Sequence, residues 1–383
     1  MAVDPVTSER QHIHALVEYA IHRRASDVVV KAGTSPALRI DGRLTRTDLP
    51  ILTGRDAREL AREVIDSASR DRMLLADEGD GDATDDSAEW MHQLSEGREL
   101  DTVFTVPGLV RVRCNLFLQR GAIGAALRII PLQPYTIDEL NLPAQLKTVA
   151  LEPQGLVIVT GPTGSGKTTT MAALIEQINR NVHANIFTVE DPVEYVFQDK
   201  LSLIHQREVG SDTSSFDTAL RSVMRQSPDV IAIGELRDRE TVEVAMQAAE
   251  IGHLVLTTLH TTSAAATIDR IVNRFPEHLK RDVCQQLAAS LLCVSSQRLV
   301  RRSDGKARVP AVEVMTVSPT VRKQLEDGDT TDLNTAIANG SHFGMITINQ
   351  ALCALCKSGR VTSEEATAVS SNVSELRQML RGL

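Results

Sequence analysis

The sequence is poor in aromatic residues, with one tryptophan, three tyrosines and seven phenylalanines scattered over 383 positions. Proteins that bind single-stranded nucleic acid normally stack bases on clustered aromatic side chains, so this scarcity argues against such a surface. A basic excess is also missing, because 41 lysines and arginines stand against 50 aspartates and glutamates. General nucleic-acid binders normally carry a net positive charge. We therefore expect no nucleic-acid partner.

Cysteines and long hydrophobic runs are scarce as well. The five cysteines are odd in number, as expected of reduced cytoplasmic thiols. Cys353 and Cys356 form a lone C-x-x-C pair without the further ligands that a zinc site needs, so we expect both to be buried helix residues. No apolar run approaches the roughly 20 residues that span a bilayer. The N-terminal segment lacks the features of an export signal, and together these features predict a cytoplasmic protein.

Residues 1–133 are expected to form a small α+β domain. Apolar residues recur with helical spacing over His12–Arg24, and Thr53 could cap a helix over Gly54–Leu75. Asp41-Gly42 lies between two short alternating runs, which predicts a hairpin with a tight primed turn. Further strands are predicted at Val28–Val30, Asp101–Val106, Leu109–Gln119 and Gly124–Ile130.

After a proline-rich linker, residues 134–313 show the pattern of an α/β domain. Short and almost continuously apolar runs alternate with helices, as expected for a parallel sheet that helices cover on both faces. The predicted strands are Leu156–Thr160, Asn185–Val189, Val230–Gly234 and Leu254–Leu259. Residues 314–383 are expected to be helical, without a strand.

Directly after the first of these strands, residues 161–168 read GPTGSGKT, which matches the phosphate-binding P-loop at every fixed position. The glycines let the backbone curl so that N–H groups meet phosphate oxygens, and the following helix points its positive end at the same anion. Lys167 should reach the β- and γ-phosphates, and the Thr168 hydroxyl should bind Mg²⁺. The candidate nucleotide-binding residues are Gly161, Thr163, Gly164, Ser165, Gly166, Lys167, Thr168 and Thr169.

Two more strands end in acids at the edge where the P-loop lies. Glu190 follows the second strand and is placed to orient an attacking water, although capping or surface charge would also explain it. Glu235 ends the strand Val230–Gly234 in the manner of a Walker B acid, which holds Mg²⁺ or its water shell. We therefore predict ATP and Mg²⁺ as cofactors, with Thr168 and Glu235 at the metal.

Two histidines and several arginines are further candidates for catalysis. His253 and His260 lie at opposite ends of the strand Leu254–Leu259, and we favour His260 near the phosphate and His253 in a structural or relay role. A guanidinium supplied by a neighbouring subunit often stabilises the charge that develops on the γ-phosphate. The candidates are Arg111, Arg113, Arg207 and Arg221, and a surface or interface salt bridge is an equally good interpretation of each.

As a set, GPTGSGKTTT, EDPVEY, HQREV, IAIGELRDRETV and AEIGHLVLTTLHTTSAAATIDRIVNRFP resemble the secretion ATPase superfamily, and within it the pilus retraction ATPase (PilT) family. The resemblance runs from Ala25 to near Leu352. It implies a PAS-like N-terminal domain, a RecA-like ATPase domain and a homohexamer. It also implies an inner-membrane platform protein and related pilus ATPases as partners, with peripheral association at the cytoplasmic face.

By the same resemblance, Glu190 matches the family's water-activating acid, Glu235 its Walker B acid, and His253 and His260 its His box. Arg111 and Arg113 match N-domain arginines that reach the nucleotide, and the resemblance assigns Arg207 and Arg221 to phosphate sensing. Cleft closure between the domains would then drive pilus retraction and twitching motility.

The C-terminal helix of the family departs here from its usual form. The matching stretch is Thr320–Asp327, in which Arg322 keeps the first arginine of the pattern and Glu326 replaces the second. An accessory PilU-like retraction ATPase is therefore an open alternative. A pilus-assembly or type II secretion motor, a DNA-translocating RecA-type ATPase and a scaffold that binds ATP without hydrolysis are weaker ones.

The negative charge is concentrated in one segment, because seven carboxylates and no lysine or arginine lie between Asp77 and Glu89. Relative to the family, residues 76–98 form an insertion. The order of acids does not fit a calcium-binding loop, so we expect a solvated loop. A partner contact through Trp90, Met91 and Leu94 is the alternative.

Overall fold

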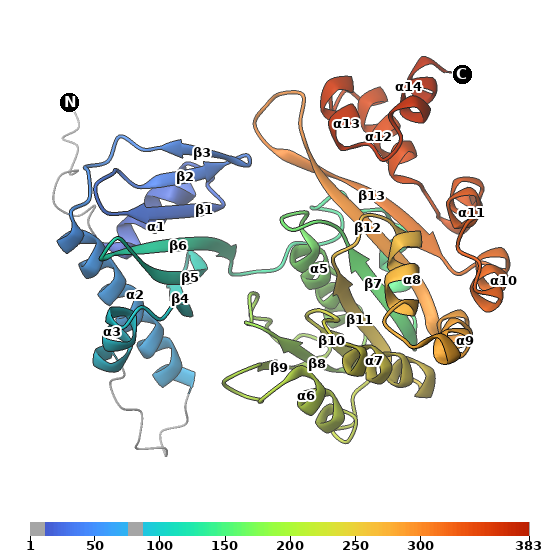
Figure 1. Cartoon of the computed structure of the whole chain (residues 1–383), viewed down its shortest axis with the longest axis horizontal. Coiled ribbons are helices and arrows are strands. Elements are labelled where there is room, and N and C mark those ends of the chain that lie inside the picture. The colour runs from blue at the N-terminus through green and yellow to red at the C-terminus, as the bar shows by residue number, and fades with distance from the viewer. Residues whose placement is uncertain (1–11, 76–86, 383) are drawn as a thin grey trace. The chain divides into compact units, whose positions relative to one another are not determined.

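The computed structural model describes residues 12–75 and 87–382, and the chain divides into two compact units, Met1–Leu132 and Gln133–Leu383 (Figure 1). Each unit has a hydrophobic core of its own. The fold is of the α/β class expected from the sequence, with a small α+β N-terminal domain and a RecA-like domain built on a mostly parallel sheet. Among the described helices, none combines the length and the hydropathy needed to cross a lipid bilayer.

In its described part, the N-terminal unit has a six-stranded antiparallel sheet with the order β3-β2-β1-β6-β5-β4. Buried and half-buried residues alternate along β5, because only one face of the sheet packs against the helices. Asp41 and Gly42 have φ angles of 50° and 82°, the geometry of the predicted primed turn. The elements are α1 (Ile13–His22), β1 (Asp27–Lys31), β2 (Ala37–Ile40), β3 (Arg43–Arg46), α2 (Gly54–Leu75), α3 (Ser87–Ser95), β4 (Leu100–Val106), β5 (Val110–Gln119) and β6 (Ala122–Pro131).

The acidic insertion, residues 76–98, differs from the solvated loop that the sequence predicts. Residues 76–86 lie outside the described residues, but Ser87–Ser95 is the helix α3 and not a loop. Trp90 is 8% exposed and Leu94 is 1% exposed, and both belong to the N-terminal core, with Met91 packed against it. The alternative prediction of a partner contact through these three side chains is therefore wrong, because they stabilise the fold of their own unit instead.

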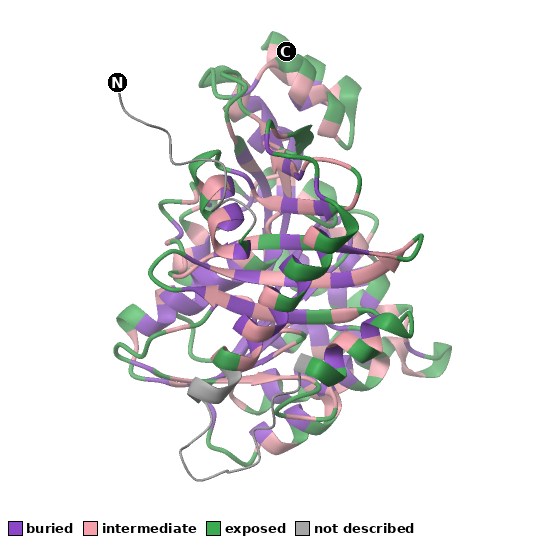
Figure 2. Ribbon diagram, turned by 90° about the vertical axis from the view of Figure 1, so that its left-hand side faces the viewer, coloured by how far each residue is buried: buried purple, intermediate pink, exposed green. Residues whose placement is uncertain are grey.

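The described part of the second unit has a seven-stranded sheet with the order β13-β12-β7-β11-β10-β8-β9, parallel except for β13. Its central strands are fully buried. Figure 2 shows buried residues, in purple, along the strands and exposed residues, in green, mostly on loops and helix surfaces. Its strands are β7 (Gly155–Thr160), β8 (Asn185–Glu190), β9 (Leu203–Glu208), β10 (Val230–Ile233), β11 (Leu254–Leu259), β12 (Leu291–Arg301) and β13 (Arg308–Thr316).

Helices cover both faces of this sheet and form separate cores with it. On one face pack α4 (Gln145–Val149) and α5 (Lys167–Asn181). The other face carries α6 (Phe216–Val223), α7 (Arg239–Ile251), α8 (Ala264–Val272), α9 (Lys280–Ser290), α10 (Pro319–Asp327) and α11 (Leu333–Asn339). The short 3-10 helices η2 (Glu277–Leu279) and η3 (Ser341–Phe343) connect some of them.

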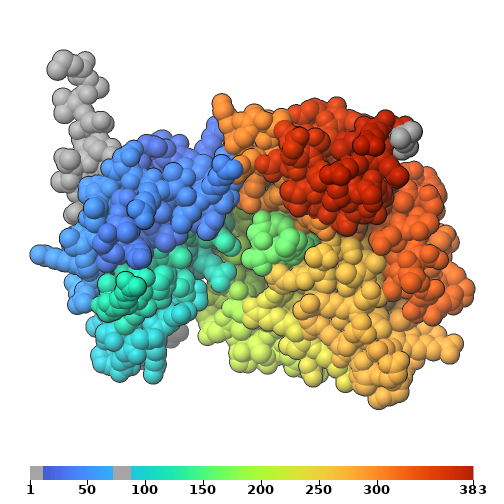
Figure 3. All heavy atoms as spheres, turned by 45° about the horizontal axis from the view of Figure 1, so that its top comes forward, coloured from blue at the N-terminus to red at the C-terminus, as the bar shows by residue number. Residues whose placement is uncertain are grey.

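The C-terminal region differs from the expectation of helices alone. The strand β13 continues to Thr316, and β12 and β13 form a long antiparallel hairpin that the sequence pattern does not predict. The helices α12 (Ile348–Lys357), α13 (Ser363–Val369) and α14 (Val373–Arg381) pack on the far end of this hairpin, as the red and orange surfaces in Figure 3 show. Cys353 and Cys356 lie in α12, the former buried and the latter half-buried. The described residues contain no cluster of metal-ligating side chains.

Candidate nucleotide-binding site

The P-loop connects the buried strand β7 to the helix α5 at the carboxyl edge of the sheet. Gly161 has a φ of 147°, and a Cβ atom at this position would lie 2.4 Å from the Gln297 carbonyl oxygen. Gly164 has a φ of 77°, a conformation that side chains rarely adopt. The two glycines therefore allow the chain to turn between strand and helix. The first turn of α5, which begins at Lys167, faces this loop, so its free N–H groups suit an anion.

Lys167 is 8% exposed and bends back onto its own loop. Its Nζ donates to the carbonyl oxygens of Gly161 at 3.0 Å and Pro162 at 3.2 Å. Burial lowers the pKa of Lys167, and the negative charge of Glu235 opposes that effect in part. The ammonium is thus held at the loop, where a bound phosphate could replace the carbonyl groups as its partner.

His260 connects the P-loop lysine to the Walker B acid. Its Nδ1 lies 3.3 Å from Lys167 Nζ, and its Nε2 lies 3.1 Å from Glu235 Oε2. An ammonium can only donate, so Nδ1 accepts from Lys167 while Nε2–H donates to the carboxylate. The structure therefore brings together three residues that the sequence placed at the ends of different strands.

Arg237 joins this group and was missed by the sequence analysis. Its Nε hydrogen-bonds to Glu235 Oε1, and its Nη1 donates to Asp191 Oδ2 at 2.9 Å. Burial would raise the pKa of Glu235, but Arg237 and then His260 outweigh it, so the net pKa is lowered and the carboxylate stays ionised. The only sequence signal was an arginine two residues after the strand-ending acid.

Glu190 ends β8 and has a hydrogen-bond network of its own. Its Oε1 accepts from Thr188 at 2.7 Å and from Gln206 Nε2 at 3.2 Å, and its Oε2 accepts from the Glu194 amide at 3.4 Å. Burial raises the pKa of Glu190, and these hydrogen bonds oppose the shift. A carboxylate with a raised pKa is a better proton acceptor, as a general base requires.

Gln297 supports the P-loop from the neighbouring strand β12, and the sequence analysis did not predict it. Its Nε2 donates to the Ser165 carbonyl at 2.7 Å, and its Oε1 accepts from Thr170 at 2.9 Å. Gln297 is 1% exposed, so both bonds are shielded from water. No local sequence pattern signalled this residue, because the strand β12 itself was not predicted.

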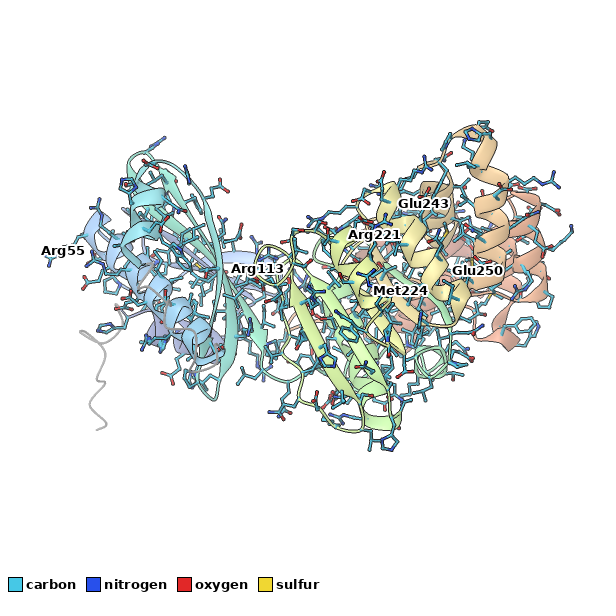
Figure 4. The ribbon with its side chains drawn as sticks, turned by 90° about the horizontal axis from the view of Figure 1, so that it is seen from below. Arg55, Arg113, Arg221, Met224, Glu243 and Glu250 are labelled. Carbon is cyan, nitrogen blue, oxygen red and sulfur yellow. The ribbon has the colours of Figure 1, made fainter. Side chains whose placement is uncertain are left out.

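The remaining candidates in the second unit lie in different places. His253 precedes β11 at the edge of the sheet opposite the P-loop, where its carbonyl accepts from the Gly155 amide at 3.0 Å. Arg207, the second-last residue of β9, donates through Nη2 to the Asp212 carbonyl at 2.9 Å, while its buried Nη1 has no hydrogen-bond partner among the described residues. Arg221 is exposed on α6 and pairs with Asp217 at 2.9 Å, and Figure 4 shows it near Glu243 of α7.

Arg111 and Arg113 belong to the N-terminal unit. They alternate on the strand β5, opposite Thr105 and Val103 of β4, so their side chains share one face of the sheet. Both are half-buried, and Arg113 is labelled in Figure 4.

Thr168 and Thr169 lie in the first turn of α5, where Thr168 is exposed and Thr169 Oγ1 accepts from the Tyr195 hydroxyl at 3.4 Å.

A cavity of about 390 Å³ lies beside the P-loop and includes Ser165, Gly166 and Thr169 in its wall. Apolar side chains of Leu140 and Leu299 line it together with polar and basic residues. The Ser165 hydroxyl is buried and has no hydrogen-bond partner among the described residues, so the loop has an unused polar group. The site therefore combines an anion-binding loop with an adjoining partly apolar hollow.

This arrangement defines a P-loop nucleotide-binding protein with a RecA-like fold. Residues 124–379 match the family model described as "Type II/IV secretion system protein". The type IV pilus retraction ATPase PilT of Pseudomonas aeruginosa is 39% identical over 92% of this chain and 96% of its own length. The type IV pilus ATPase PilU of the same organism is 34% identical over 96% of this chain and 90% of its own.

A crystal structure of the pilus retraction motor PilT with bound ADP is similar along nearly the whole length. Its TM-score is 0.79 at 40% sequence identity, covering 96% of this chain and 99% of that one. The chain therefore belongs to the type II/IV secretion system protein family.

Proposed function

We propose that this protein is an ATP-hydrolysing motor that powers type IV pilus retraction. The observation that carries the proposal is the similarity to PilT over almost the full length of both chains, together with the P-loop and its acids. By the same similarity, it would act as a homohexamer at the cytoplasmic face of the inner membrane, bound to a pilus platform protein. Nucleotide-driven closure between the domains would supply the movement.

In this proposal, the triphosphate lies in the P-loop and the nucleoside in the adjoining cavity. Lys167 would donate to phosphate oxygens in place of the loop carbonyls, and His260 would lie beside the γ-phosphate. Glu190 would accept a proton from the attacking water, because its raised pKa and fixed geometry suit a general base. An arginine among Arg111, Arg113, Arg207 and Arg221 would stabilise the transition state, in cis or from a neighbouring subunit.

The residues present fit Mg²⁺. Thr168 is exposed at the start of α5 and Glu235 has a lowered pKa, so a hydroxyl and an ionised carboxylate are available as hard oxygen ligands. The metal would neutralise phosphate charge. Arg237 and His260 now hold both Glu235 oxygens, so they would have to release at least one of them.

The direct test is phosphate release by wild-type protein and by Lys167→Ala. Removing a charge that the transition state needs should lower turnover by at least about 100-fold. Equal rates for the two proteins would contradict the assignment of the P-loop. In cells, deletion of the gene should give hyperpiliated bacteria without twitching motility, whereas bald cells would indicate an assembly motor.

An accessory PilU-like role is the second candidate, and the helix α10 favours it. Arg322 of this helix donates to the Ala288 carbonyl, whereas Glu326, which replaces the family's second arginine, is exposed to solvent. ATP hydrolysis would be unaffected, but coupling to retraction would differ. A deletion that weakens twitching without abolishing it would support this role over that of the main motor.

A further inference from the structure

The antiparallel hairpin of β12 and β13 carries two opposite charges, the half-buried Arg298 and the buried Glu313. Glu313 lies opposite Ser296 in the strand register, so Arg298, two residues further along β12, is its diagonal neighbour on the same face. Glu313 is 4% exposed, although carboxylates are seldom fully buried without a specific role. Neither residue belongs to the P-loop or to the group of acidic residues described above.

Glu313 binds the first residues of two helices that are far apart in sequence. Its Oε1 accepts from the amide of Ala264, which begins α8, at 2.7 Å. Its Oε2 accepts from the amide of Ile348, which begins α12, at 3.4 Å. A carboxylate at a helix N-terminus satisfies a free N–H group and interacts favourably with the helix dipole. One side chain thus fixes the starts of both helices.

Arg298 makes a parallel connection between the same two regions. Its Nη2 donates to the Thr262 carbonyl at 3.2 Å, and its Nη1 donates to the carbonyl of Val369, the last residue of α13. Thr262, Arg298 and Val369 line one cavity, which also includes Thr163 of the P-loop. Glu313 and Arg298 therefore both join the segment around residues 260–264 to the C-terminal helices.

That segment begins with His260, the residue that contacts Lys167 and Glu235. Buried hydroxyls also join the segment to the P-loop, because Thr160 Oγ1 accepts from the Thr261 amide at 2.9 Å and lies 2.6 Å from Thr261 Oγ1, and Thr160 is the last residue of β7 before that loop. A change at the P-loop or at His260 would therefore reach the Thr262 carbonyl and the start of α8 through these neighbouring residues. Both of these are held by the charged pair.

We propose that Glu313 and Arg298 are positioning residues that couple the His260 segment to the C-terminal helices α12 and α13. Nucleotide binding at the P-loop would then change the hydrogen bonding of α12 and α13 through this pair. The inference rests on the proposed function, because it assumes that ATP binds beside His260. It adds a route by which nucleotide binding at the P-loop would affect the C-terminal helices, which lie outside the site.

Hydrogen exchange on the full-length protein tests the coupling directly. Adding a non-hydrolysable ATP analogue to the wild type should slow exchange in peptides covering residues 260–272, 345–357 and 363–369. In Glu313→Gln, which keeps the size of the side chain but can no longer accept at both atoms, the change in 260–272 should remain. The change in 345–357 should fall at least about threefold, because the bond to Ile348 is weakened.

Glu250→Gln is the matched control, since this glutamate is exposed near the end of α7, and it should respond as the wild type does. Arg298→Lys is the second variant, because it keeps the charge but loses the guanidinium that bridges the Thr262 and Val369 carbonyls. In this variant the analogue-induced change in peptides covering residues 363–369 should fall, and that result decides the matter if Glu313→Gln does not fold. Equal analogue effects in the wild type and in the folded variants would overturn the coupling, as would a wild type without any change in 345–357.

Steady-state ATP hydrolysis adds a second measure. A coupling defect should lower kcat about fivefold or more and leave KM within about twofold, whereas a general loss of structure would raise KM as well. A wild-type protein that hydrolyses no ATP would refute the proposed function, independently of the exchange results. Active wild type with an unchanged kcat in both variants would count against the coupling alone.

Discussion

The substitution Arg237→Gln should affect the empty and the metal-loaded site in opposite ways. Arg237 bonds to Glu235 and Asp191, and a charge-assisted hydrogen bond contributes about 1.5–3 kcal/mol when it is buried. The Arg237 side chain is 53% exposed, so solvent screening reduces both bonds together to about 1–2 kcal/mol. Losing them should lower Tm by about 3–6 °C in the absence of nucleotide, given the size of the domain.

The same interaction competes with Mg²⁺ for Glu235. Removing a competitor worth about 1 kcal/mol should lower the Mg²⁺ concentration at half-maximal nucleotide binding by about fivefold. Thermal unfolding measures the first effect, and titration of a fluorescent ATP analogue with Mg²⁺ measures the second. Arg239→Gln removes a similar ion pair, with Glu243, and should leave the Mg²⁺ titration unchanged. An unchanged or higher Mg²⁺ requirement in Arg237→Gln would refute the competition.

The remaining predictions concern Gln297, Glu190 and Trp90. Gln297→Leu should weaken binding of fluorescent ADP by about 3–10-fold, since two shielded hydrogen bonds are lost, one to the P-loop at Ser165 and one to Thr170 of α5. An equal Kd would show that the loop does not need this support. Glu190→Gln should bind nucleotide but lose at least about 100-fold in kcat. In the wild type, kcat should rise with pH through a midpoint above 4.5, because burial raises the pKa of a base that must be ionised, and a midpoint at or below that value would contradict this role. The same raised pKa should lower folding stability as the pH rises from the ordinary value through the raised one. Trp90→Ala should destabilise the N-terminal unit by about 3–5 kcal/mol in denaturant unfolding, and no change would show that α3 contributes nothing to the core.

Local patterns predicted the strand, loop and helix around the P-loop, as well as the Asp41-Gly42 hairpin. In both cases the neighbouring residues determine the backbone conformation, whether through glycine at positive φ or through uninterrupted apolar strands. The edge of the parallel sheet that carries Lys167, Glu235 and His260 followed from the same strands, because parallel strands deliver their carboxyl ends to one side.

Contacts between distant segments explain what could not be predicted. The strand β12 contains Ser295, Ser296 and Gln297, which are polar but fully buried because β12 is an inner strand of a sheet that is covered on both faces. The bond from Gln297 to Ser165 joins residues 132 positions apart, and no local pattern reports it. Likewise, the acidic composition of the insertion concealed Trp90 and Leu94, which form the apolar face of α3.

The site supplies partners for its own charges. Lys167 has the loop carbonyls and His260, and Glu235 has His260 and Arg237. When nucleotide dissociates, the ammonium and the carboxylate would therefore still have partners. Dissociation would not carry the free-energy penalty of leaving a buried charge unpaired. Affinity for nucleotide is reduced by the strength of these internal contacts. An ATPase must release its product nucleotide before the next round of hydrolysis, so the lower affinity would make each round faster.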